Sequence, residues 1–158
     1  MNDKLKSLAS LVNIISRLKK QGKKVVFTNG CFDIIHVGHI DYLLKARKRG
    51  DILVIGLNSD ASVRRLKGKG RPINREGDRA KVLSALYFVD YVTIFNEDHP
   101  ELLVRKLKPN IMVKGGDWKG REVAGADFVR SLGGRLVIVP LVQGYSTTAV
   151  VKKIARKA

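Results

Sequence analysis

Two short segments of this chain carry residue types that suit phosphate binding. In the stretch Asn29-Gly-Cys-Phe-Asp-Ile-Ile-His-Val-Gly-His39, two histidines stand three residues apart with Gly38 between them. Imidazole N–H groups can keep donating hydrogen bonds to a pyrophosphate oxygen in the transition state, and they need no metal ion to do so. Gly38 lies at the mouth of a predicted helix, where a small residue lets a phosphate reach the free backbone N–H groups. The segment therefore predicts an anion site built on His36 and His39.

Two other interpretations of the histidine pair compete with this one. Histidines at a helix start can simply cap the helix, and histidines at short spacing can bind zinc. The chain has one cysteine, Cys31, and one further histidine, His99, so a zinc site would be short of protein ligands. We therefore favour phosphate binding over both alternatives.

Hydroxyl side chains gather in a second segment, Gln143-Gly-Tyr-Ser-Thr-Thr148, directly before the last predicted helix. Taken alone, Ser146 and the two threonines after it are ordinary residues for a helix N-terminus. Facing the histidine pair at the same end of a sheet, however, they would form the second wall of a phosphate cradle. The two segments together therefore predict a phosphate site more strongly than the second segment does alone.

The elements between these segments must position them. Short apolar runs alternate with amphipathic stretches, which predicts a parallel sheet covered on both faces. Strands are predicted at 25–28, 52–57, 91–95, 111–113 and 136–139, helices at 5–18, 38–49, 79–87, 100–107, 123–132 and 146–156, and a loop at 58–74. The expected fold is α/β, a Rossmann-like doubly wound parallel five-stranded sheet in a single domain, with an N-terminal helix in 1–22 and the core in 23–158. Ligands of such sheets bind beyond the carboxyl ends of the strands.

The net charge is the extreme quantity of the composition. The chain has 31 Lys and Arg against 14 Asp and Glu, which gives +17. Such an excess can bind nucleic acid, steer multiply anionic substrates to an enzyme, or merely solvate helix faces. Aromatic residues make up 6% and are not interleaved with the basic runs, which argues against a stacking platform for single strands. We therefore expect no nucleic-acid partner.

Other features bear on location. No apolar run approaches the roughly 20 residues that a membrane helix needs. The first residues lack the apolar core and cleavage site of a signal peptide. A single cysteine allows no internal disulfide and suits a reducing compartment. We expect a cytoplasmic protein with no membrane partner.

The two phosphate-binding segments together resemble the HxGH and STT-type motifs of the cytidylyltransferase-like nucleotidyltransferases, a Rossmann-like family. Further segments make the chain similar to the adenylyltransferase domain of bacterial ADP-heptose synthesis: Phe27-Thr-Asn-Gly-Cys-Phe-Asp33, Asn58-Ser-Asp-Ala-Ser-Val63, Gly70-Arg-Pro-Ile-Asn74, Asp78-Arg79, Val113-Lys-Gly-Gly-Asp117 and Pro140-Leu-Val142. The resemblance covers nearly the whole chain. It implies transfer of AMP from ATP to D-glycero-β-D-manno-heptose 1-phosphate, which yields ADP-heptose for the lipopolysaccharide core and pyrophosphate. In many bacteria this domain follows a sugar kinase in the same chain. The present sequence has no kinase portion, so it resembles the stand-alone form.

The resemblance also implies roles for individual residues. Those that would act on the triphosphate in catalysis are His36, His39, Lys67 and Arg79, with Lys69 and Arg71 as competitors of Lys67. Those that would bind the nucleotide are Gly30, Phe32, Gly38, Lys114, Gly115, Gly116, Asp117, Tyr145, Ser146 and Thr147. Those that would bind the sugar phosphate are Asn29, Cys31, Asp33, Asn58 and Trp118, and Asp33 is also the candidate ligand of a Mg²⁺ ion. A homodimer is implied by the resemblance alone.

Alternative functions stay open beside this one. A cytidylyltransferase for glycerol 3-phosphate usually carries an Arg-Thr-Glu-Gly run before its STT segment, whereas this chain has Leu141-Val-Gln-Gly144 without the arginine. An adenylyltransferase acting on FMN would share the same motifs. A nonenzymatic nucleic-acid binder would use the net charge and release no pyrophosphate.

Overall fold

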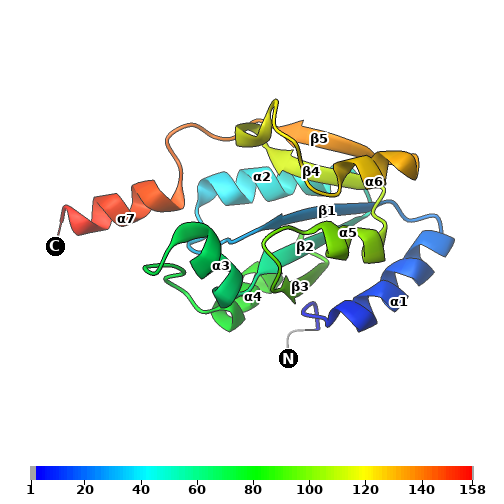
Figure 1. Cartoon of the computed structure of the whole chain (residues 1–158), viewed down its shortest axis with the longest axis horizontal. Coiled ribbons are helices and arrows are strands. Elements are labelled where there is room, and N and C mark those ends of the chain that lie inside the picture. Colours follow the sequence, from blue (N-terminus) through cyan, green and yellow to red (C-terminus); the bar gives the residue numbers. More distant parts are fainter. Residues whose placement is uncertain (1–2, 158) are drawn as a thin grey trace.

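The computed structural model describes residues 3–157 and shows a five-stranded sheet with the strand order β3-β2-β1-β4-β5 (Figure 1). All neighbouring strands are parallel. The strands are β1 (Val25–Gly30), β2 (Ile52–Asn58), β3 (Tyr91–Phe95), β4 (Ile111–Gly115) and β5 (Arg135–Val139). They are short, apolar and rich in β-branched residues, as expected for strands that are buried on both faces. The predicted Rossmann-like parallel sheet is confirmed.

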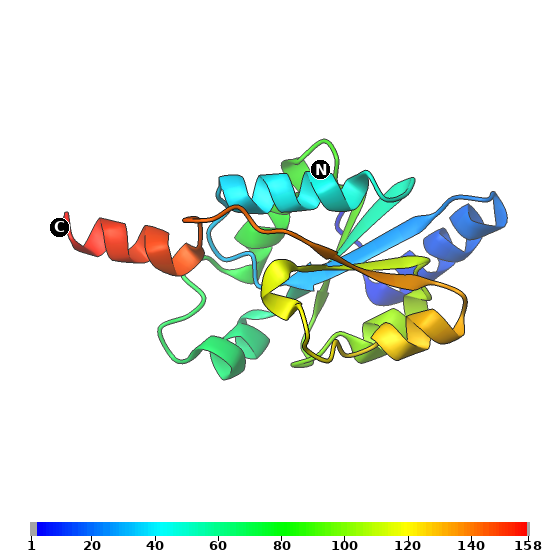
Figure 2. The same ribbon diagram turned by 90° about the horizontal axis from the view of Figure 1, so that it is seen from above.

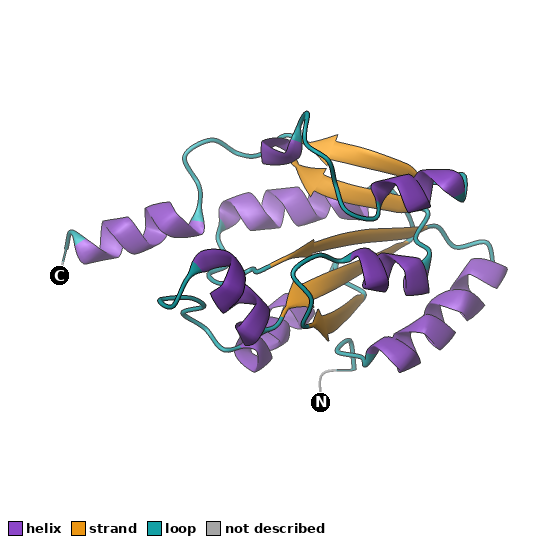
Figure 3. Ribbon diagram, viewed as in Figure 1, coloured by secondary structure: helices purple, strands orange, loops and turns teal. Residues whose placement is uncertain are grey.

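Helices cover both faces of the sheet (Figures 2 and 3). One face packs against α2 (Val37–Arg47) and α4 (Glu76–Ala85). The other packs against α1 (Leu8–Lys20), α5 (Glu101–Leu107) and α6 (Ala126–Ser131). The two remaining helices, α3 (Asp60–Lys67) and α7 (Thr147–Ala155), lie toward the carboxyl ends of the strands. Within residues 3–157, no helix combines the length and apolar character needed to cross a membrane.

The direction of winding reverses between β1 and β4. From β1 the chain moves outward to β2 and β3, and it then returns to the other side of β1 to form β4 and β5. Phe27 of β1 pairs with Met112 of β4, so the same register brings Asn29 beside Lys114 two residues further on. In doubly wound sheets, the crevice at such a reversal is where ligands bind.

The prediction of a loop over 58–74 was wrong, because the first half of this segment forms α3. The hydroxyl of Ser59 accepts a hydrogen bond from the backbone N–H of Ser62 at 3.1 Å and caps the helix start. The glycines that indicated a loop, Gly68 and Gly70, lie beyond the helix end. Glycine disfavours a helix only where it stands, so it says little about the residues before it.

Several other boundaries differ from those predicted, and three of them bear on the site. The helix α4 begins at Glu76, so Arg79 lies within it rather than at its start. The strand β4 continues to Gly115 and leads into a short 3₁₀ turn, Gly116–Trp118. The helix α6 begins at Ala126 because Gly125 has a φ of 88°, a left-handed conformation that a right-handed helix cannot contain.

Candidate active site

A cavity of about 860 Å³ opens at the carboxyl ends of the central strands. Its lining comes from the loops after β1, β3 and β4, from the starts of α2 and α7, and from the end of α3. It contains every residue that the sequence predicted for the site except Arg79 and Gly116. The predicted residues that line it are Asn29, Gly30, Cys31, Phe32, Asp33, His36, Gly38, His39, Asn58, Lys67, Lys114, Gly115, Asp117, Trp118, Tyr145, Ser146 and Thr147.

The two histidines are stacked at the start of α2. Their ring centroids lie 3.9 Å apart with an interplanar angle of 30°, and Phe32 packs against His39 at 5.3 Å. His36 occupies the N-cap position but makes no side-chain hydrogen bond to the helix, so the interpretation of the pair as a simple cap is wrong. The Nδ1 atoms of both rings are buried without a hydrogen-bond partner among residues 3–157. Buried polar atoms are normally paired, so neither Nδ1 atom is used in a contact within the fold, and a ligand would meet the parts of the two rings that line the cavity.

Burial also sets the charge of the pair. It lowers the pKa of His39 to about 4, and the charge of His36 lowers it as well. Burial also lowers the pKa of His36. Both rings are therefore mainly neutral at neutral pH, and each retains one N–H donor. A bound polyphosphate would raise both pKa values, because a nearby anion favours the protonated form.

The start of α7 lies against His36 and His39, which we call the histidine turn. A Cβ atom at Gly38 would come within 3.2 Å of the Cβ atom of Tyr145 and within 3.0 Å of the His36 ring. The rings of His36 and Tyr145 are stacked at 6.5 Å. Only glycine fits this contact without displacing a neighbour. The two segments that the sequence singled out therefore meet at one cavity.

Ser146 is the N-cap of α7, as its simplest interpretation predicted. Its Oγ accepts a hydrogen bond from the backbone N–H of Ala149 at 3.0 Å, which leaves the hydroxyl proton free to be donated. Thr147 and Thr148 line the cavity beside it. A helix N-terminus with free N–H groups and the positive end of the helix dipole attracts anions. Capping and phosphate binding are therefore compatible at this position.

A buried lysine stands at the end of β4. The Nζ atom of Lys114 donates a hydrogen bond to Oδ1 of Asn29 at 2.7 Å and lies 4.7 Å from the centroid of the Trp118 ring. Burial lowers the pKa of Lys114 to about 8, whereas the charges of Asp117 and Cys31 raise it. At neutral pH the amine is therefore mainly charged, at a position where little solvent reaches it.

The carboxylate of Asp33 is engaged by the protein and does not fit the metal-binding role that was predicted for it. Its oxygens accept hydrogen bonds from the backbone N–H groups of Ile73 and Asn74 at 2.9 Å and from Arg71 at 3.0 Å. Burial raises the pKa of Asp33, but the hydrogen bonds of Asn74, Ile73 and Arg71 outweigh it, and the net pKa is lowered. Asp33 thus anchors the loop after α3. No cluster of three or more His, Cys, Asp or Glu that could hold a metal ion occurs in residues 3–157.

Arg79 is likewise a structural residue in this fold, contrary to its predicted place over the phosphates. Its side chain is fully buried and pairs with Asp60 at 2.8 Å. Its other nitrogen atoms donate to the backbone carbonyls of Asn74 and Cys31. These bonds engage the guanidinium on all sides beneath the cavity. No sequence pattern indicated this role, because the partners come from three separate segments.

Three basic residues near the end of α3, Lys67, Lys69 and Arg71, were candidates for contact with the triphosphate, and the structure distinguishes them. Lys67 is the last residue of α3 and lines the cavity, and it has no hydrogen bond or ion pair within residues 3–157. Arg71 also lines the cavity but is paired with Asp33. Lys69 is not part of the lining. Of these three basic residues, Lys67 is therefore the one that lines the cavity without a partner in the described part of the chain.

Some lining residues were missed by the sequence analysis. Asp98 and His99 come from the loop after β3, and Glu122 follows the 3₁₀ turn. The rule that ligands bind beyond the carboxyl ends of parallel strands already pointed to the loop after β3, and that loop was the signal for the first two. Tyr42 gave no such signal, because its place in the wall depends on contacts with β1 and β4.

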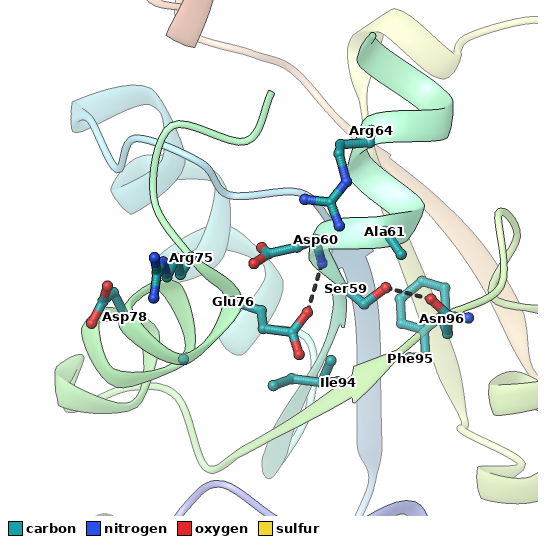
Figure 4. Close-up of a pocket in the computed structure, with 11 residues that line it drawn as sticks. Ser59, Asp60, Ala61, Arg64, Arg75, Glu76, Asp78, Ile94, Phe95 and Asn96 are labelled. Carbon is teal, nitrogen blue, oxygen red and sulfur yellow. Dashed lines mark hydrogen bonds between the residues drawn. The ribbon is translucent and has the colours of Figure 1, made fainter. Parts of the chain in front are cut away.

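A second hollow of about 820 Å³ lies where α3 and α4 begin (Figure 4). Two of its hydrogen bonds join lining residues to one another. Glu76 accepts a hydrogen bond from the backbone N–H of Asp60 at 2.6 Å, and the Ser59 hydroxyl donates to Asn96 at 2.7 Å (Figure 4). None of the predicted site residues lines it. We interpret this hollow as the junction of two helix starts rather than as an active site.

Comparison with known proteins agrees with this geometry. The model of the family described as cytidylyltransferase-like matches residues 27–153. The chain is 57% identical over 151 residues to the bifunctional protein HldE of Campylobacter concisus, an alignment that covers 96% of the chain and 31% of that protein. The chain thus spans about a third of the length of the curated relatives it matches.

Solved structures extend the comparison. A lipopolysaccharide core biosynthesis protein from Thermoplasma volcanium is 33% identical, with a TM-score of 0.64, and the match covers 79% of this chain and all of that one. Pantothenate synthetase from Thermus thermophilus has a TM-score of 0.67 at 17% identity, covers 98% of this chain and 70% of its own, and shares the fold alone. Because the family match spans most of the chain, including the histidine turn and the start of α7, this chain belongs to the cytidylyltransferase-like family.

Proposed function

We propose that this protein transfers the adenylyl group of ATP to D-glycero-β-D-manno-heptose 1-phosphate, forming ADP-heptose and pyrophosphate. The observation that carries the proposal is the meeting of the stacked histidines with the start of α7 at one cavity. Two neutral imidazoles and a helix N-terminus are suited to a triphosphate. The Thermoplasma volcanium relative is described as a lipopolysaccharide core biosynthesis protein, which supports a sugar nucleotide as the product.

The reaction is an in-line displacement at the α-phosphorus of ATP. An oxygen of the sugar phosphate forms a bond to this phosphorus, and the bond to the oxygen that bridges to the β-phosphorus breaks. Pyrophosphate leaves with the electron pair. The attacking phosphate is already anionic at neutral pH, so no protein nucleophile or general base is needed. Catalysis then depends on positioning and on neutralising the charge of the leaving group.

The phosphate-binding roles follow the walls of the cavity. His36 and His39 donate N–H bonds to the β- and γ-phosphates and strengthen these bonds as negative charge builds on pyrophosphate. Ser146 and Thr147 hold the same phosphates at the start of α7. Lys67, at the free end of α3, closes over them. Arg79 supports the floor of the site and contacts no substrate.

Other walls bind the rest of the two substrates. We assign the adenine and ribose to the residues around the end of β4 and near the histidines: Gly30, Phe32, Gly38, Gly115, Gly116, Asp117 and Tyr145. The sugar phosphate faces Asn29, Cys31, Asn58 and Trp118. A Mg²⁺ ion would arrive bound to phosphate oxygens and waters, since Asp33 is engaged and the described residues offer no carboxylate cluster.

Further properties are proposed from the family resemblance. Residues 1–158 would act as a single nucleotidyltransferase domain, with small-molecule substrates and no nucleic-acid or membrane partner. The active form would be a homodimer in the cytoplasm. Sedimentation analysis of the purified chain tests the homodimer directly.

Pyrophosphate release is the test of the reaction. The protein is given ATP or CTP separately, each with heptose 1-phosphate, glycerol 3-phosphate or FMN, and a His36→Ala/His39→Ala double variant serves as the control for contaminating activity. We expect pyrophosphate from ATP with heptose 1-phosphate and from no other pair at a comparable rate. Turnover with CTP and glycerol 3-phosphate, or with ATP and FMN, would replace the proposed acceptor. Salt-sensitive binding of DNA or RNA without any pyrophosphate would overturn the proposal.

A further inference from the structure

We infer that the ammonium group of Lys114 binds the phosphate of the acceptor, on the wall of the cavity opposite the histidines. The family resemblance assigned Lys114 to the nucleotide, so this inference changes its role. It rests on the proposed function and deepens it, because it locates the subsite of the attacking phosphate.

The first argument is the state of the buried amine. Lys114 is 6% exposed, and lysine is almost never buried to this extent without a charged partner. Within residues 3–157, its Nζ atom makes one hydrogen bond, to the neutral amide of Asn29, and no ion pair. Two of its three N–H donors are therefore left for a ligand. The Asp117 carboxylate is near enough to raise the pKa of Lys114 but forms no ion pair with it within residues 3–157, so an anion supplied by a substrate would complete the compensation of the buried charge.

The second argument is the position of Lys114 in the sheet. Phe27 and Met112 belong to the core beneath α1, α5 and α6. Side chains alternate along a strand, so Asn29 and Lys114, two residues further on, point to this same side. The histidines stand at the start of α2, which covers the opposite face.

The third argument comes from the geometry of the reaction. In an in-line displacement, the attacking oxygen and the leaving oxygen lie on opposite sides of the phosphorus. With pyrophosphate held by the histidine turn, the attacking phosphate must approach from across the cavity. Lys114 is a buried cation at the reversal between β1 and β4, and it points to the face of the sheet away from α2 and its histidines.

The neighbours of Lys114 keep its charge available. The Trp118 ring lies 4.7 Å from Nζ, and such a contact favours the cation without neutralising it. Asn29 fixes the amine by a single hydrogen bond. A compact ammonium on a flexible stem suits a phosphate as a point charge. Together these three residues form a subsite for one phosphate group.

The test compares Lys114→Met and Lys114→Arg with Lys119→Met, which removes an exposed lysine outside the cavity. We expect Lys114→Met to raise the KM for heptose 1-phosphate roughly 100-fold, since a desolvated ionic contact is lost, with the KM for ATP changed less than about twofold. Lys114→Arg should recover part of the loss because it restores the charge. Lys119→Met should leave both constants unchanged. An equal rise in the KM for ATP, or no rise in either, would overturn the inference.

Folding of the variant has its own readout. Methionine has a similar volume and no charge, so Lys114→Met should melt at the same temperature as the parent protein or higher. Calorimetric binding of ATP should be preserved. A lower melting temperature together with lost ATP binding would show that Lys114 is structural.

A measurement without turnover separates this inference from the proposed function. In protein labelled with ¹³C at the lysine ε-carbons, the resonance missing from Lys114→Met is titrated with and without inorganic phosphate or methyl phosphate. Either probe should raise the pKa of Lys114 from its lowered value. If no sugar phosphate gives pyrophosphate but this pKa still rises, the proposed function fails and the phosphate subsite stands. An unchanged pKa with both probes would refute the subsite.

Discussion

Two groups of buried nitrogen atoms near the carboxyl end of the sheet differ in their hydrogen bonding. One group belongs to the imidazoles of His36 and His39, and the other belongs to the guanidinium of Arg79. The histidines keep buried Nδ1 atoms with no partner among residues 3–157. Arg79 is buried more completely, yet its nitrogen atoms bond to Asp60, Asn74 and Cys31. We call Arg79 and these three partners the floor network, in contrast to the histidine turn.

The difference between the two regions shows how burial and pairing together separate function from structure. A buried polar group that is fully paired stabilises the fold and has nothing left for a substrate. A buried polar group without a protein partner costs stability, and it marks a place where the fold does not use the side chain for its own bonding. Residue type does not tell the two apart, since the sequence placed both in the same catalytic group.

The largest effect is expected from breaking the floor network. Arg79→Met leaves Asp60 and two carbonyl oxygens without their donor, so the free energy of unfolding should fall by about 3–5 kcal/mol. Denaturant unfolding measures the loss. Arg130→Met, which removes an exposed ion pair with Asp127, is the control and should change stability by less than about 1 kcal/mol. If Arg79→Met kept its stability and lost only ATP binding, Arg79 would belong with the histidine turn.

Substitutions in the histidine turn should lower activity strongly and stability less. His36→Ala and His39→Ala each remove a donor to the leaving pyrophosphate, so kcat should fall roughly 100-fold or more. Their free energies of unfolding should fall by less than that of Arg79→Met. Steady-state pyrophosphate release and denaturant unfolding are measured on the same preparations. Near-normal turnover in both variants would contradict the assignment of the histidine turn.

A smaller effect is expected at the rim of the cavity. Lys67 is exposed and solvent screens its charge, so Lys67→Met should lower kcat/KM for ATP by roughly tenfold. Lys69→Met is the matched control, because Lys69 lies two residues away and outside the lining. Equal losses in the two variants would indicate general steering by the basic surface instead of a contact.

The smallest effect concerns pH. The pKa of His39 is about 4 in the folded protein and near 6.5 in the unfolded chain, so folding favours the neutral ring. Stability from this group is complete above pH 6.5, falls as the pH drops toward 4, and is lost below it. At pH 5 the loss is about 1 kcal/mol after a discount for partial exposure.

Thermal melting at pH 7 and pH 5 measures this effect. The parent protein should lose more stability between these values than His39→Ala does. Saturating ATP should reduce the difference, since a bound anion raises the pKa of the ring. Identical pH dependence in the two proteins would mean that His39 is not held in the neutral form.

Sequence patterns alone determined the sheet, the sides of the sheet that are buried, and the two segments of the histidine turn and α7. Each of these signals is local. Apolar periodicity reports the face that a strand or helix buries, and alternating strands and helices force parallel pairing. The crevice rule then gave the correct end of the sheet for the cavity.

Tertiary structure decided what each charged residue does. Asp33 anchors a loop some forty positions away along the chain, and Lys114 is held by Asn29 across 85 positions. Arg79 is fixed by three segments that all precede it in the chain. A charged side chain binds a ligand or a protein group according to which partners surround it. Those partners come from distant segments that only the folded chain brings together, so no local pattern could reveal them.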